Sequence, residues 1–181
     1  ERIKTIRVSE RMAYQKITDL FIATATDYNP KSEEAYTFFK IVQNKLHYAI
    51  SGYTAAELIY NRVNSEKEHM GLTSWKNSPN GKIMESDVII AKNYLDEKEI
   101  KNLNNLVNLF LDIAENNAER NIPMYMNDWK KEVENALTLF HYEVLNDKGK
   151  ISHKDAVQKA LSEYEKYRII QDKNYVSDFD K

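Results

Sequence analysis

The chain has 181 residues, with 26 Lys and Arg against 28 Asp and Glu and a formal net charge of −2, a length that suits one domain. The near balance of charges argues against a dedicated nucleic-acid-binding domain, which normally carries a basic excess. Four Gly, three Pro and no Cys argue against a turn-rich β-sandwich or barrel and against a glycine-built phosphate loop, and they exclude disulfides, thiolate metal ligands and Cys nucleophiles.

The apolar spacing predicts helices along most of the N-terminal half. Residues 1–25 form the first helical stretch, whose thin and basic start indicates either the end of a longer connector helix or a frayed terminus. A turn at 27–30 leads into a second helix that ends near residue 50, where Gly52 suits a C-terminal cap. Thr54 and Glu57 form a capping-box sequence that opens a short helix to about residue 64.

Residues 65–86 interrupt this pattern and hold three of the seven Gly and Pro residues, namely Gly71, Pro79 and Gly81. Loops of this length in compact domains are usually functional or disordered. Trp75 and two apolar neighbours argue against a solvated linker, which rarely carries so much apolar surface. We therefore expect this loop to pack onto the helices.

The C-terminal half reads as four further helices. A short helix is expected from residue 86 or 87 to residue 94, and a long one follows until Pro123 ends it. Another covers about 126–146, and Ser152 caps the last, which runs to about residue 171.

The fold prediction is thus all-α: a compact bundle of about six to seven helices with one long packed loop at about residues 65–86. We expect residues 1–25 to form a connector from a preceding domain, 26–171 the helical domain and 172–181 a polar tail, with Tyr175, Val176 and Phe179 available for docking. The chain shows neither a signal-peptide pattern nor the roughly 20 apolar residues of a membrane span. We therefore expect a cytoplasmic protein without membrane contact.

Polar side chains gather in and just after the long loop, beside a helix start of the kind that binds anions readily. His47, near the end of its helix and next to a capping turn, is the histidine best placed to face a groove. Together they form a candidate nucleotide or phosphate pocket: His47, His69, Thr73, Ser74, Trp75, Lys76, Lys82, Asp87, Lys92 and Asn93. The alternative is a purely structural loop. No two His residues have metal-ligand spacing, so neither a metal nor another cofactor is predicted, and no catalytic residue is assigned.

Tyrosine is frequent, with 12 residues against 6 Phe and 2 Trp. A Tyr ring buries its apolar body and keeps a polar tip, so Tyr is favoured at protein interfaces. Tyr142, Tyr164, Tyr167 and Tyr175 lie toward the C-terminus, where they indicate either an interface or a partly wet helical core. We expect a homo-oligomer or a protein partner.

Several runs, in order along nearly the whole chain, resemble the virulence-associated RhuM family. They are RMAYQKITD (11–19), VQNKLH (42–47), TAAELIY (54–60), MGLTSW (70–75), SDV (86–88), AKNYL (91–95), PM (123–124), DW (128–129), GKIS (149–152) and EYEKY (163–167). The resemblance implies a bacterial protein, with DNA contacted only through a helix-turn-helix-type region that precedes the present sequence. Some members are described as DNA-binding proteins encoded beside restriction–modification genes. The family offers no catalytic residues to carry over.

A weaker similarity concerns residues 47–52, whose His-to-Gly spacing resembles the nucleotidyl-transfer loop of Fic proteins. Ser51 stands where that loop has an acidic residue, and its second Gly and its Arg are absent. We therefore do not predict an active loop of this type. The favoured function is a helical interaction or oligomerisation domain, and the alternative is a nucleotide- or phosphate-binding enzyme domain built on His47 and residues 69–93.

Overall fold

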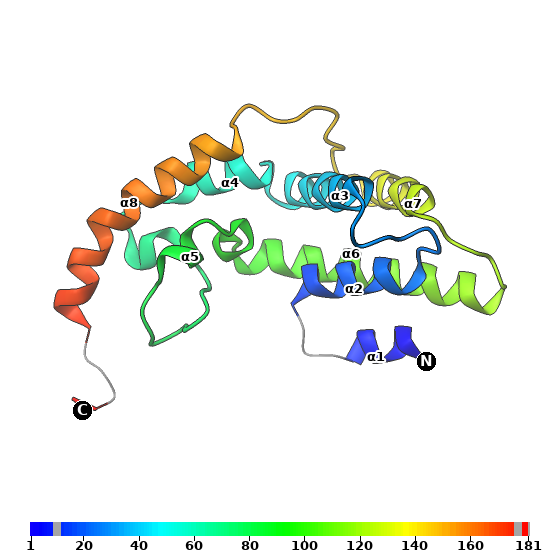
Figure 1. Cartoon of the computed structure of the whole chain (residues 1–181), viewed down its shortest axis with the longest axis horizontal. Coiled ribbons are helices and arrows are strands. Elements are labelled where there is room, and N and C mark those ends of the chain that lie inside the picture. The colour runs from blue at the N-terminus through cyan, green and yellow to red at the C-terminus, as the bar shows by residue number, and fades with distance from the viewer. Residues whose placement is uncertain (9–11, 176–178, 181) are drawn as a thin grey trace. The chain divides into compact units, whose positions relative to one another are not determined.

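The computed structural model describes residues 1–8, 12–175 and 179–180. Within these ranges the secondary structure consists of α-helices and short 3₁₀ helices, and the single strand-type pairing is an isolated bridge between Ala25 and Met124. This confirms the all-α prediction (Figure 1). In the described ranges, no helix combines the length and the apolar character that crossing a membrane requires.

The helices form two compact units. Unit 1 comprises Glu1–Gly52 and Glu97–Asn146, and unit 2 comprises Tyr53–Asp96 and Asp147–Lys181. The boundaries expected after residues 25 and 171 stay a prediction. Part of the expected tail, including Val176, lies outside the described residues, whereas Phe179 is fully exposed.

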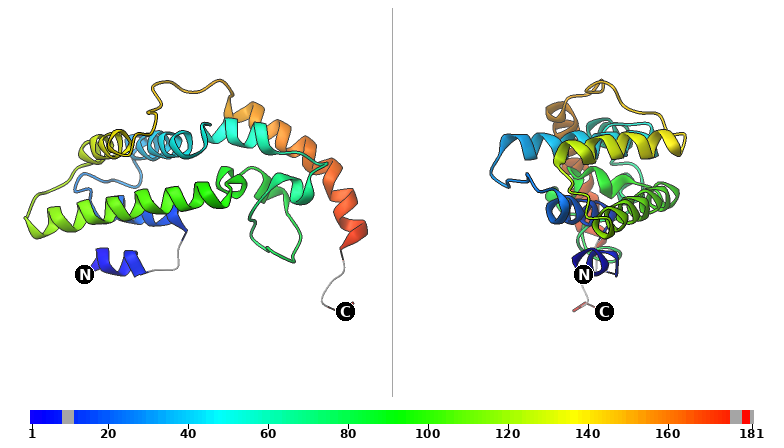
Figure 2. Two further views of the ribbon diagram at one scale, coloured as in Figure 1. Left: turned by 180° about the vertical axis from the view of Figure 1, so that it is seen from behind. Right: turned by 90° about the vertical axis from the view of Figure 1, so that its right-hand side faces the viewer.

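Unit 1 contains five α-helices within its described residues. They are α1 (Arg2–Val8), α2 (Ala13–Thr24), α3 (Glu33–Ser51), α6 (Glu97–Glu119) and α7 (Met126–Leu139). Helices α3 and α7 lie side by side in every view (Figure 2). The predicted first helix corresponds to α1 and α2; of the residues between them, 9–11 lie outside the described ranges.

The core of unit 1 is built around Trp129, which has no exposed surface. Its ring centroid lies 5.0 Å from that of Phe21 on α2 and 6.3 Å from that of Phe110 on α6. Its indole N–H donates to the hydroxyl oxygen of Thr24 at 2.7 Å. One residue on α7 therefore joins three helices through apolar contact and also satisfies its own polar group.

The helix predicted over 126–146 is shorter than expected, because α7 ends at Leu139. His141 adopts a left-handed conformation with φ of 61°. The amides of His141 and Tyr142 bond back to the carbonyls of Thr138 and Leu137 at 3.1 and 2.9 Å. This closing pattern usually has Gly at the left-handed position, which is why the sequence pattern did not reveal it.

Lys45 on α3 holds the extended segment that follows α7. Its ammonium donates to the carbonyl oxygen of Leu145 at 2.9 Å and lies 3.1 Å from a carboxylate oxygen of Glu134. Leu145 is buried. The chain after α7 thus gains burial and a charge-assisted hydrogen bond by leaving the helical path.

Unit 2 is built on α8, the helix His153–Asn174. The other described elements of this unit are α4 (Ala55–Arg62), α5 (Glu85–Val88) and the 3₁₀ helices η1 (Glu68–Gly71) and η2 (Ala91–Tyr94). The short helix expected to end near residue 94 is therefore two turns, α5 and η2.

Small residues allow α8 to lie close to α4. Ala156 and Ala160 are completely buried, and α8 makes its most extensive contact with α4. The start of α4 carries the predicted capping box: the amide of Thr54 donates to Glu57 at 2.9 Å, and the amide of Glu57 donates to the Thr54 hydroxyl at 3.3 Å. The second carboxylate oxygen of Glu57 accepts from the Lys150 amide at 3.2 Å, which ties the segment before α8 to α4.

The long loop is packed, as predicted. Met70, Leu72, Trp75 and Ile83 are all buried. Gly71 has φ of +84°, and a Cβ atom there would overlap the carbonyl oxygen of Arg62, so the close approach of these two backbone segments requires glycine.

Candidate functional site

Asp87 organises the polar segment that the sequence singled out. Its side chain is buried. One carboxylate oxygen accepts from the backbone amide of Lys76 at 3.1 Å, and the other accepts from the amide of Met84 at 2.7 Å. Asp87 therefore closes the loop over residues 76–84 and caps the start of α5. Both oxygens are engaged in holding the loop's own backbone.

Asn93 fixes the other side of the same segment. Its carbonyl oxygen accepts from the amides of Thr73 and Ser74 at 2.7 and 3.2 Å and from the Thr73 hydroxyl at 3.1 Å. Its side-chain amide donates to the carbonyl oxygen of Asp87 at 3.0 Å. Four predicted site residues are thus brought together, and they meet as a hydrogen-bonded scaffold.

Trp75 is buried in the loop, and its indole N–H donates to the carbonyl oxygen of Gly81 at 2.8 Å. The imidazole of His69 packs against its ring, with centroids 4.7 Å apart. The Lys76 side chain is exposed and that of Lys92 is half-buried. In the described parts of the chain, neither ammonium makes a hydrogen bond or ion pair, so these two lysines are the predicted site residues whose charge stays available.

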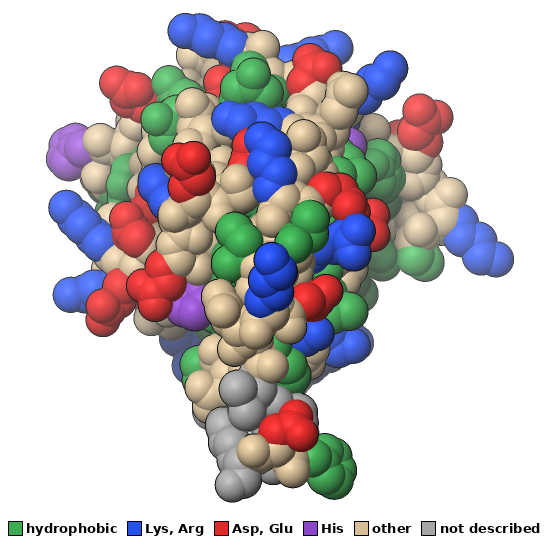
Figure 3. All heavy atoms as spheres, turned by 90° about the vertical axis from the view of Figure 1, so that its left-hand side faces the viewer, with side chains coloured by type: hydrophobic (Ala, Val, Ile, Leu, Met, Phe, Trp, Pro, Cys, Tyr) green, Lys and Arg blue, Asp and Glu red, His purple; other side chains and the backbone are tan. Residues whose placement is uncertain are grey.

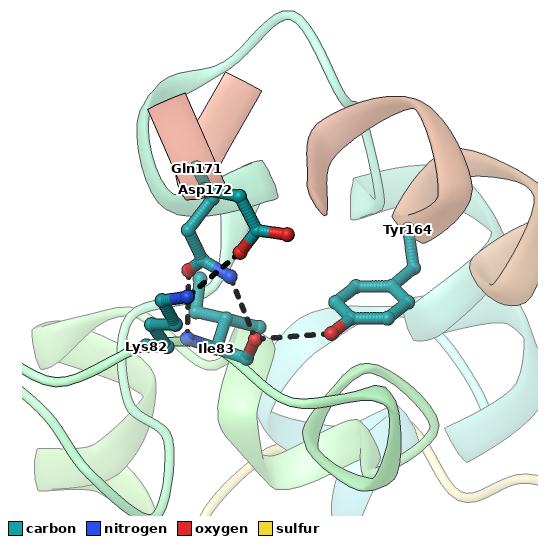
Figure 4. A network of polar contacts seen from close by, with 5 residues as sticks. All are labelled: Lys82, Ile83, Tyr164, Gln171 and Asp172. Carbon is teal, nitrogen blue, oxygen red and sulfur yellow. Dashed lines mark hydrogen bonds and ion pairs between the residues drawn. The ribbon is translucent and has the colours of Figure 1, made fainter. Parts of the chain in front are cut away.

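The loop is also fastened to the C-terminal half of α8 (Figure 4). The Gln171 side chain accepts from the Ile83 amide at 2.8 Å and donates to the Ile83 carbonyl at 2.9 Å. Lys82 pairs with Asp172 at 2.8 Å, and this carboxylate raises the pKa of Lys82. The Tyr164 hydroxyl lies 3.4 Å from the Ile83 carbonyl. One glutamine therefore satisfies both backbone groups of a residue whose side chain is buried.

Replacing Gln171 by alanine is expected to lower the free energy of unfolding by about 1–3 kcal/mol, because the Ile83 amide loses its partner. Urea denaturation measures this loss, and hydrogen exchange at the Ile83 amide should become faster. Asp172→Asn is the control, since it alters only the exposed ion pair on the same turn of α8. Equal losses in both variants would contradict the role assigned to Gln171.

His47 belongs to unit 1, whereas the other nine predicted site residues belong to unit 2. Its ring is buried, and its Nδ1 atom lies 2.9 Å from the Tyr14 hydroxyl. Burial lowers the pKa of His47 to about 3, so the ring is neutral at physiological pH; with its proton on Nε2, Nδ1 accepts the Tyr14 hydroxyl proton. Residues 47–51 continue α3 up to its cap at Gly52. The joint pocket of His47 and residues 69–93 stays a prediction.

Two features of unit 2 lie outside the predicted set. An open groove of about 420 Å³ is lined by Tyr60, Ile151, Asp155, Gln158, Lys159 and Ser162. The C-terminal half of α8 leaves Ile169 and Ile170 about half exposed, at 53% and 51%. The helical spacing of the α8 residues was visible in the sequence, but the contribution of Tyr60 depends on how α4 packs.

In the ranges that the structure describes, no three His, Asp or Glu side chains are grouped so that they could hold a metal ion. A search of the curated proteins and a search of the solved structures found no match for the chain. The model of the virulence protein RhuM family matches residues 1–176 of the 181. The chain thus belongs to the RhuM family, as the resemblance of its sequence runs implied.

Proposed function

We propose that this RhuM family chain is a helical self-association domain. The observation that supports it is the apolar surface that unit 2 leaves in contact with solvent. Its large exposed apolar side chains among the described residues are Met84, Ile89, Ile90, Ile169, Ile170, Tyr175 and Phe179. Single exposed apolar residues are ordinary, whereas larger gatherings mark interaction sites. Met84, Ile89 and Ile90 flank α5, Ile169 and Ile170 lie in the C-terminal part of α8, and Tyr175 and Phe179 follow α8 in the sequence. Helices α5 and α8 contact each other.

The mixture of positive and negative side chains on this surface supports a second copy of the same chain as the partner. Figure 3 looks onto the side on which Figure 1 draws α5 and α8, and Lys and Arg side chains there alternate with Asp and Glu, with hydrophobic side chains between them. Such a surface favours no strongly charged partner. In a family whose members are expected to contact DNA through another region, self-association would pair two such regions, the arrangement that two DNA half-sites require.

Sedimentation velocity of the 181-residue chain over a wide range of concentration tests this proposal. We expect the average mass to rise with concentration toward that of a dimer. A chain that stays monomeric at every concentration would refute self-association.

The alternative is a nucleotide- or phosphate-binding domain that uses the free lysines Lys76 and Lys92. The engagement of Asp87, Asn93 and Thr73 in loop hydrogen bonds favours self-association over this alternative. Thermal denaturation with nucleotides and divalent metal ions separates the two. A rise in Tm that is lost in Lys76→Ala and Lys92→Ala would support the binding domain.

A further inference from the structure

One face of α8 combines the groove with the exposed isoleucines. At 3.6 residues per turn, eight residues fall within an arc of about 120°. They are Asp155, Gln158, Lys159, Ser162, Lys166, Ile169, Ile170 and Lys173. The face runs the length of the helix beside the one that buries Ala156 and Ala160 against α4. We call it the outer face of α8.

The N-terminal half of the outer face is concave. Tyr60 and Ile151 supply apolar surface to the groove. The Lys159 ammonium donates to the Tyr60 carbonyl at 2.6 Å and lies 4.2 Å from the centre of the Tyr60 ring, so it is held toward α4. Its alkyl stem therefore adds further apolar surface to the groove.

The C-terminal half of the outer face carries two neighbouring exposed isoleucines, which we call the isoleucine ridge. Ile169 and Ile170 are both more than half exposed, and Lys166 and Lys173 lie one turn to either side of them. The Lys166 ammonium lies 3.4 Å from Glu163. Unit 2 therefore has a groove and an apolar ridge on the same face of one helix.

The charged residues nearest the two ends of the outer face have opposite signs. Asp155 lies near its N-terminal end and Lys173 near its C-terminal end, a separation of 18 residues or about 27 Å along the helix axis. If two copies of α8 run antiparallel about a two-fold axis near residue 164, each Asp155 faces Lys173 of the second copy. In this register Ile170 faces Gln158 and Ile169 faces Lys159, so the ridge of each copy meets the groove of the other. Ser162 faces Lys166 of the second copy, so a small side chain meets a long one on either side of the axis.

We propose that the chain forms a two-fold dimer in which the outer faces of two α8 helices pack antiparallel, the isoleucine ridge of each copy filling the groove lined by Tyr60 and Ile151 in the other. This inference rests on the proposed self-association and names its surface. The contact is isologous, because each patch meets the complementary patch on the same helix, and it closes on itself without forming a filament.

Charge reversal tests the register directly. Asp155→Lys and Lys173→Asp, each made alone, place like charges at two symmetric positions, and each is expected to raise the dimer dissociation constant about tenfold. The double variant restores both pairs and is expected to return to within about threefold of wild type. An equimolar mixture of the two single variants should likewise form heterodimers, since every pair in the mixed dimer joins Lys to Asp.

The apolar part of the contact has a matched control. Ile170→Ser is expected to weaken dimerisation by about tenfold or more, because it removes one buried side chain from each half. Leu139→Ser changes an aliphatic residue of unit 1 that is also exposed and belongs to neither the outer face nor the apolar surface of unit 2, and it should leave the dissociation constant unchanged. Circular dichroism confirms that each variant is folded.

The outcomes separate the inference from the proposed function. A dimer that survives Ile170→Ser and both charge reversals would retain self-association and overturn the α8 surface. Loss of the dimer in the single charge variants without recovery in the double variant would overturn the antiparallel register. A monomeric wild-type chain would overturn both.

Discussion

Replacing Trp129 by alanine is expected to lower the free energy of unfolding by about 3–5 kcal/mol. The indole is completely buried, packs against Phe21 and Phe110, and donates a hydrogen bond to Thr24. Its removal leaves a cavity among three helices and takes away the hydrogen bond that the Thr24 hydroxyl oxygen accepts. Because domains of this size are stable by only about 5–15 kcal/mol, the loss is a large share of the total, and urea denaturation followed by circular dichroism measures it.

Trp129→Phe provides the matched comparison. It keeps an aromatic ring in the same space and removes the indole N–H, so a smaller loss of about 1–2 kcal/mol is expected. Trp75, the second tryptophan of the chain, lies in unit 2, and its fluorescence follows that unit in both variants. A loss below about 1 kcal/mol in Trp129→Ala would show that this residue does not hold the core of unit 1 together.

His47 is expected to make the chain progressively less stable as the pH falls below its unfolded-state pKa. Burial lowers the pKa of the folded-state ring to about 3 from an ordinary value of 6.5. Between these values the unfolded chain binds a proton that the folded chain does not, so protonation favours unfolding. The contribution of His47 is full above pH 6.5 and decreases by up to about 1.4 kcal/mol per pH unit as the pH falls toward 3.

The measurement compares the slope of unfolding free energy against pH in wild type and in His47→Asn. The asparagine keeps an acceptor near the Tyr14 hydroxyl but does not titrate, so its slope between pH 6 and 4 should be smaller. His141→Asn is the control, since His141 is exposed and its left-handed backbone suits asparagine. Identical slopes in wild type and His47→Asn would contradict the predicted role of burial.

The polar segment between His69 and Asn93 shows which part of a candidate site can be predicted from the sequence. The sequence showed the density of polar residues between His69 and Asn93, and hydrogen bonds join Thr73, Ser74, Asp87 and Asn93 of this segment. The sequence did not show which of these side chains stay available to a ligand. That depends on hydrogen bonds between segments that meet only in the folded chain. The Lys76 amide reaches Asp87 over 11 residues, and the Ile83 amide reaches Gln171 over 88. Only folding decides whether a carboxylate or an amide is already engaged.

Helix starts and the class of fold were predictable because they depend on neighbours in the chain. Ser32, Thr54 and Ser152 each accept a hydrogen bond from a backbone amide three residues later, and the spacing of apolar residues identifies the buried stripes. The end of α7 was not predictable, because a histidine stands where glycine is usual and Lys45, nearly a hundred residues earlier, holds the chain that follows.

For the outer face of α8, too, one part was determined by the sequence and the other by tertiary structure. The sequence alone determines that Asp155, Ile170 and Lys173 share one helix face, since helical geometry follows from spacing. Tertiary structure decides that Tyr60 turns part of this face into a groove and that Ile170 stays about half exposed. Periodicity specifies which side chains point the same way, whereas burial depends on the packing of segments that are distant in the chain.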